Sequence, residues 1–129
     1  MAGIEHRKHT RLPLAMDVEL TLADGSVHKG WTRNISFGGM LVGVAGQLAI
    51  TAGELLELAL IMHSREPRLA IEFECRVVHQ GDAGLGLQFI AMDIGVYQHF
   101  MNLMVLNSPN PDALLEELRK NPGLLVKNG

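Results

Sequence analysis

The chain has 129 residues, a length that predicts one domain with a hydrophobic core rather than a multidomain enzyme. Hydrophobic residues make up 47% and charged residues 19% of the sequence, which excludes a disordered chain. The formal net charge of -3 excludes a broad basic surface for a DNA or RNA polymer, so we expect an anion to bind only where cations are concentrated.

The beginning of the chain, residues 1–13, predicts a polar and cation-rich arm that is flexible and extended. No apolar stretch of signal-peptide length follows it, and the most apolar window, residues 55–62, is far shorter than the about 20 residues of a membrane helix. The one cysteine, Cys75, cannot form an internal disulfide bond. We therefore expect a cytoplasmic protein that does not insert into a membrane.

Alternating apolar residues dominate the middle of the chain. From Leu14 to Leu22 every second residue is apolar, the period of a strand with one buried face, and a turn signal follows at Asp24 and Gly25. Similar patterns predict strands over residues 27–35, 40–44, 55–62, 69–78 and 85–89. Several short strands separated by turns favour a mainly β protein built as a small antiparallel barrel over an α/β fold.

The pattern becomes helical after Phe89, and Asp93 is placed to cap a helix that we expect to lie on the barrel. A second, short helix is predicted to begin at Asn110 and Pro111, with basic residues at its end. Its leucine face could dock on the barrel or on another chain. We assign residues 14–106 to the barrel and the first helix, and residues 107–129 to a C-terminal extension with the short helix.

The densest positive charge lies in residues 6–11, where Arg7 and Arg11 stand four residues apart. Two guanidinium groups on a flexible arm can converge on one anion, because each makes paired hydrogen bonds to phosphate or to the O6/N7 edge of guanine. Taken alone, the pair is weak evidence of a site, since a solvated basic tail is the commoner explanation.

A second polar group follows the predicted strand over residues 27–35. Asn34 and Ser36 are two residues apart and so emerge on the same side of a strand end, where both could face one ligand. Glycine at position 38 or 39 permits a positive φ and lets a ligand approach the backbone closely. The alternative is a turn in which Asn34 and Ser36 satisfy local backbone groups.

The two groups together form the motif RxxxR at Arg7 and Arg11 followed by NxSxxG at Asn34, Ser36 and Gly39. This combination resembles the signature of the PilZ domain family, bacterial receptors for cyclic di-GMP. The resemblance extends to residue 106 and implies a six-stranded antiparallel β-barrel with a helix at its C-terminal side. It further implies that the arginines contact the phosphates and guanines of the ligand, that Asn34 and Ser36 hydrogen-bond to it, and that Gly39 keeps the surface clear.

Secondary contacts are expected from four further residues, which are His6, Lys8, Arg33 and Gly38. His6 stands where many members of the family carry another arginine, so the resemblance leaves open whether one ligand molecule or an intercalated pair is bound. Lys8 and Arg33 could attract the ligand or could simply be solvated.

Nothing in the sequence groups a nucleophile with a base or sets out metal ligands, and His6 and His9 lack companions for a metal site. We expect no catalysis, no metal and no cofactor other than the ligand itself. The resulting hypothesis is a receptor that binds cyclic di-GMP and relays its occupancy to an unidentified protein effector through the arm or a surface rearrangement. The alternative is an adaptor of the same fold that acts by protein contact without the nucleotide.

Overall fold

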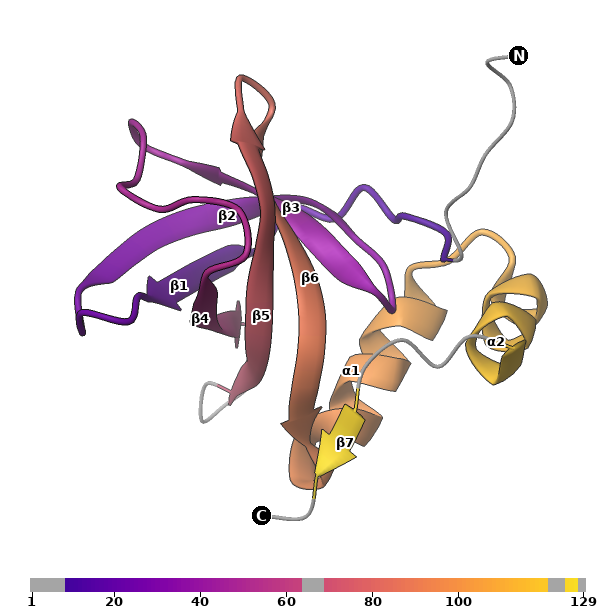
Figure 1. Ribbon diagram of the computed structural model, residues 1–129. Helices are drawn as coiled ribbons and strands as arrows, with labels where there is room; N and C mark the ends of the chain where they lie inside the picture. The colour runs from indigo at the N-terminus through magenta and orange to yellow at the C-terminus, as the bar shows by residue number, and fades with distance from the viewer. Residues whose placement is uncertain (1–8, 64–68, 121–124, 128–129) are drawn as a thin grey trace.

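The computed structural model describes residues 9–63, 69–120 and 125–127. The elements in chain order are β1 (Asp17–Thr21), β2 (Val27–Ile35), β3 (Gly39–Val44), β4 (Leu55–Met62), β5 (Leu69–Gly81), β6 (Gly84–Asp93), α1 (Ile94–Leu106), α2 (Pro111–Lys120) and β7 (Leu125–Lys127). Figure 1 shows the strands as one strongly curved sheet with the two helices beside it.

Strands β1 to β6 form a closed antiparallel barrel, which confirms the predicted fold. Their order is β3-β2-β1-β4-β5-β6, and β3 pairs back onto β6 to close the barrel. The short strand β7 joins in parallel to the end of β6, at Ala91 to Asp93, beyond the part of β6 that pairs with β3. We did not predict β7, because three residues are too few to show a period.

The alternating pattern of the sequence corresponds to the inside and outside of this barrel. Its buried side chains on β4 and β5 are those of Leu56, Leu58, Leu60, Ile71, Phe73, Cys75 and Val77. The residues between them on β5, such as Glu72 and Glu74, are exposed. The core is therefore built from one face of each strand, as expected for a half-buried antiparallel sheet.

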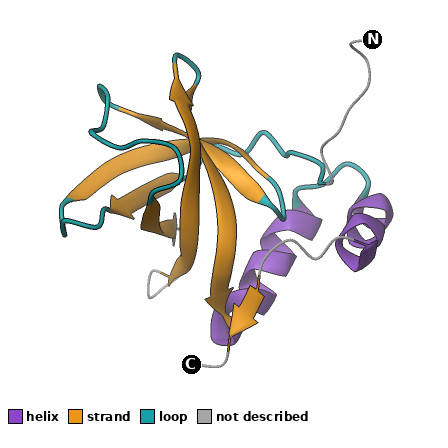
Figure 2. Cartoon of the chain, viewed as in Figure 1, coloured by secondary structure: helices purple, strands orange, loops and turns teal. Residues whose placement is uncertain are grey.

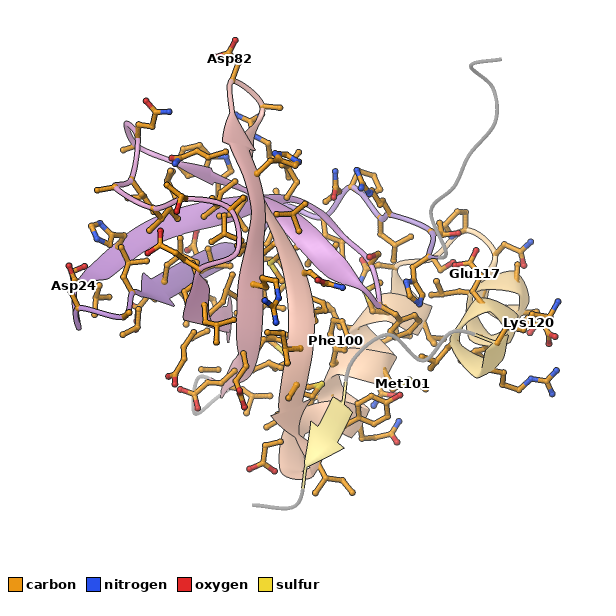
Figure 3. The ribbon with its side chains drawn as sticks, viewed as in Figure 1. Asp24, Asp82, Phe100, Met101, Glu117 and Lys120 are labelled. Atoms are coloured by element: carbon orange, nitrogen blue, oxygen red, sulfur yellow. The ribbon has the colours of Figure 1, made fainter. Side chains whose placement is uncertain are left out.

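Helix α1 completes the core and begins where the sequence predicts. Asp93 caps it by accepting a hydrogen bond from Gly95 N to Oδ1 at 2.6 Å. Phe100, labelled in Figure 3, is fully buried and places its ring edge-on to Phe73 and Phe89, with centroids 5.0 and 5.8 Å apart. Helix α1 is thus held on the barrel by an aromatic cluster.

Helix α2 docks on its own chain. It follows Asn110, whose Oδ1 accepts a hydrogen bond from Ala113 N at 3.2 Å, and Leu114 is 1% exposed in the core cluster. Figure 2 shows α1 and α2 lying together on one side of the strands, and the two helices are in contact. Leu118 is partly buried against the same core, whereas Leu115 remains exposed.

Strand β1 begins at Asp17, later than the predicted start at Leu14. The reason is the buried hydroxyl group of Thr32, which donates to the carbonyl oxygen of Leu14 at 2.5 Å and accepts from Met16 N at 2.8 Å. One backbone hydrogen bond remains, from Thr32 N to the carbonyl oxygen of Met16 at 2.8 Å, and the Thr32 side chain supplies the other two contacts, so the apolar alternation continues through a segment that is not a strand.

Candidate functional site

The arm is joined to the barrel beside the polar motif. Leu12 N donates to the carbonyl oxygen of Ile35 at 2.7 Å, and Ile35 N donates to that of Leu12 at 2.9 Å. Both side chains are buried, and the residues on either side of Leu12, Arg11 and Pro13, are exposed. This two-residue bridge brings the exposed Arg11 next to Asn34 and Ser36.

Three of the predicted ligand contacts, His6, Arg7 and Lys8, lie outside the described residues. Of the arginine pair, the structure therefore locates Arg11. Arg33 is exposed on the outer face of β2.

The hydroxyl group of Ser36 shapes the turn between β2 and β3. Its Oγ accepts hydrogen bonds from Gly38 N at 3.1 Å and Gly39 N at 3.2 Å, and it lies 3.2 Å from the carbonyl oxygen of Gly39, to which it donates. Ser36 N donates to the same carbonyl oxygen at 2.8 Å. For Ser36 the structure thus shows the local turn that the sequence left open as an alternative.

Asn34 differs from Ser36. It is half-buried on β2, and none of the described residues hydrogen-bonds to its side chain. The pairing of β2 with β3 shifts between Thr32 and Asn34, so Arg33 is the extra residue of a β-bulge. The bulge turns Arg33 and Asn34 toward the outer face, where the Asn34 amide can offer both donors and an acceptor.

The two motif glycines do not use the positive φ that glycine permits; among the described residues, the glycines with positive φ are Gly25, Gly46, Gly53 and Gly84. Close packing explains them instead. A Cβ on Gly38 would lie 2.6 Å from Nδ1 of His9, whose ring covers this glycine. A Cβ on Gly39 would lie 2.1 Å from the carbonyl oxygen of Leu87 on β6, so Gly39 permits β3 to close the barrel.

Phe37, between Ser36 and Gly38, anchors the turn in the core. Phe37 is fully buried and packs edge-on against Phe100 of α1, with ring centroids 5.6 Å apart. The backbone of the motif is therefore held by the core, which gives the polar side chains at the end of β2 a rigid support.

One contact that the sequence pattern does not indicate ties the arm to α2. Thr10 N donates to Oε1 of Glu117 at 2.6 Å, and the Thr10 hydroxyl donates to Oε2 of the same carboxylate. Glu117 is labelled on α2 in Figure 3, and Thr10 directly precedes Arg11. Because 107 residues separate the partners, no local spacing could have revealed this contact.

The one cysteine of the chain is buried in the core. Burial raises the pKa of the Cys75 thiol to about 12, which makes this thiol a poor nucleophile. Within residues 9–63, 69–120 and 125–127, no group of three or more His, Cys, Asp or Glu side chains could hold a metal ion. None of the helices found in those same ranges is long and apolar enough to cross a membrane.

Comparison with protein families matches residues 5–105 to the PilZ domain, and comparison with curated proteins finds no match. The matched range contains both halves of the motif and ends at the close of α1.

Three solved structures share the fold. The Bacillus subtilis inhibitor of motility MotI/DgrA is 22% identical with a TM-score of 0.62, over 92% of this chain and 53% of MotI, so this chain spans about half the length of that protein. The PilZ domain of CeSA from a cellulose-synthesizing bacterium is 19% identical with a TM-score of 0.57, over 73% of this chain and 93% of that one. The PilZ domain of YcgR from Escherichia coli, solved with c-di-GMP, is 16% identical with a TM-score of 0.53, over 88% of each chain.

Proposed function

This chain belongs to the PilZ domain family, and we propose that it is a receptor that binds cyclic di-GMP without catalysing a reaction. The observation that carries the proposal is the bridge between Leu12 and Ile35, which sets Arg11 beside Asn34 and Ser36. YcgR, a protein of the same fold, has a PilZ domain solved with this nucleotide.

The chemistry of the site fits a compact dianion. A cyclic dinucleotide carries two phosphates and two guanines, and a guanidinium fork binds either group through paired hydrogen bonds. In the proposal Arg11 makes such contacts, and Arg7, four residues earlier in the arm, makes them as well. His6, Lys8 and Arg33 add secondary contacts from the arm and from β2.

On the strand side of the proposed site, Asn34 and Ser36 have different roles. Asn34 hydrogen-bonds to the ligand, because its amide is turned outward by the bulge and is not used elsewhere in the described structure. Ser36 acts indirectly, because the turn that its hydroxyl stabilises holds the end of β2, where Asn34 lies.

The relay of occupancy begins, in this proposal, at the contact between Thr10 and Glu117. When the arm over residues 1–13 closes on the ligand, Thr10 moves with Arg11, and the carboxylate of Glu117 loses its partner. The change reaches α2 in the extension over residues 107–129, where a protein effector can detect it. Ligand binding and the contact then oppose each other, and each weakens the other by the same factor.

An Arg11→Ala variant tests the binding site. Titration of fluorescein-labelled cyclic di-GMP, followed by anisotropy, should show about a tenfold to hundredfold loss of affinity, the effect of removing a charge-assisted contact. Arg119→Ala is the matched control, because Arg119 is an exposed arginine that pairs with Glu116 in α2. Equal affinity of Arg11→Ala and the wild type would contradict the assignment.

A second candidate function is a protein adaptor that does not depend on nucleotide. It is favoured by Ser36, whose hydroxyl is engaged in the turn, and by the arm being tied to α2. A pull-down that recovers the same partners with and without cyclic di-GMP, by a protein that binds none, would establish the adaptor.

A further inference from the structure

Trp31 lies on the outer face of β2, close to the proposed site. It is the one tryptophan of the chain and remains 42% exposed. It shares this face with Arg33, since the residue between them, Thr32, points inward and is 1% exposed. Two residues along a strand advance about 7 Å, so the indole borders the Arg33 and Asn34 bulge.

The indole ring rests on Gly43, its pairing partner on β3. A Cβ on Gly43 would lie 2.4, 2.5 and 2.6 Å from the indole atoms Cε2, Nε1 and Cζ2. These nearly equal distances to three bonded ring atoms mean that the ring turns a face toward the glycine. One face of the indole therefore covers the strand, and the exposed fraction of Trp31 belongs to the rest of the ring.

Arg33 extends in the same direction. Its Nε lies 3.7 Å from the place of a Cβ on Gly84, at the start of β6. The side chain therefore crosses from β2 over β3, which lies between β2 and β6 in the barrel. Gly43 and Gly84 form a floor without side chains, and the indole and the guanidinium group lie upon it.

We propose that Trp31 is a specificity-determining residue on which one guanine of the ligand stacks, with Arg33 at the edge of the stacked base. The inference rests on the proposed function and extends its site along β2. An aromatic ring that is held flat and exposed is a surface for a nucleobase, and a neighbouring guanidinium can bond to O6 and N7 of guanine. In this arrangement Arg7 and Arg11 of the arm bind the phosphates of the ligand.

Two variants distinguish the proposed stacking of Trp31 on a guanine from its packing over Gly43. Trp31→Leu keeps an apolar side chain over the glycine but removes the aromatic face, whereas Trp31→Phe keeps a smaller aromatic face. Loss of stacking on one base should weaken binding of labelled cyclic di-GMP about fivefold to hundredfold in Trp31→Leu, with most of the affinity retained in Trp31→Phe. The thermal midpoints of both variants, measured by circular dichroism, identify any loss of folding.

The wild-type protein supplies a direct signal, because all tryptophan emission comes from Trp31. Stacking should quench this emission along the same saturation curve as the anisotropy of the labelled ligand. Binding by anisotropy without a change in emission, or equal affinities of a folded Trp31→Leu variant and the wild type, would overturn this inference alone. No binding by the wild type would overturn the proposed function as well.

Discussion

Replacing Ser36 with alanine, and Asn34 with alanine in parallel, separates the structural role of this motif from its proposed role toward the ligand. The hydroxyl of Ser36 takes part in three hydrogen bonds within the turn, and the residue is 7% exposed. The Asn34 side chain hydrogen-bonds to none of the described residues. The first substitution should therefore destabilise the fold, and the second should not.

The size of the effect follows from these contacts. The distances of 3.1 and 3.2 Å are at the long end of hydrogen bonding, and the half-buried Gly38 can exchange its lost partner for water. We expect Ser36→Ala to lower the free energy of unfolding by about 1–2 kcal/mol, and the thermal midpoint by about 3–6 °C. Asn34→Ala should change the free energy of unfolding by less than about 0.5 kcal/mol.

Urea unfolding followed by circular dichroism measures both changes, with an unchanged m-value as the sign that the unfolded state is unaffected. The same two proteins are then titrated with labelled cyclic di-GMP. Asn34→Ala should bind about fivefold to tenfold more weakly although it is as stable as the wild type. A stable Ser36→Ala together with a destabilised Asn34→Ala would refute our assignment of roles.

Three further predictions concern the seam of the barrel, the core and the arm. Gly39→Ala should lower the free energy of unfolding in urea by about 2 kcal/mol or more, because its Cβ would meet the carbonyl oxygen of Leu87 on β6. The control Gly81→Ala, with open space around it, should be nearly neutral. Equal stability of the two variants would be inconsistent with this packing. Cys75, with its pKa raised to about 12 by burial, should resist alkylation at about pH 8 until the protein is unfolded, and rapid labelling of the native protein would contradict its burial. Glu117→Gln weakens the contact with Thr10 and should raise the affinity for labelled cyclic di-GMP about twofold to fivefold, whereas an unchanged affinity would show that arm and α2 are not coupled.

Much of the barrel could be predicted from alternation because the core takes every second residue. The bounds of β4 agree with the predicted strand, and Asp93 caps α1 as expected. Strand β5 continues to Gly81, three residues past the prediction, and pairs there with Gly84 around a turn at Asp82 and Ala83. In the sequence, Gly81 and Gly84 look like turn residues, whereas in the structure they are the last paired residues of the two strands.

The candidate site was less accessible to sequence reasoning. The motif spacing predicted Arg11, Asn34 and Ser36 as ligand contacts, but only the structure could show that the pairing of Leu12 with Ile35 brings their backbones together. The contact with Glu117 depends on where α2 docks, which Leu114 determines through the core. The sequence showed that glycine at 38 or 39 would permit a positive φ or the close approach of a ligand, whereas the close packing of Gly38 on His9 and of Gly39 on Leu87 could be seen only in the structure.

The central claim is that this chain binds cyclic di-GMP through the arm and the end of β2. Isothermal titration calorimetry of the nucleotide into the purified wild-type protein tests it most directly. We predict a saturating heat of binding with a defined stoichiometry, which also decides between one ligand molecule and an intercalated pair. An absence of binding heat at several temperatures, with a folded protein and ligand in large excess, would contradict the claim.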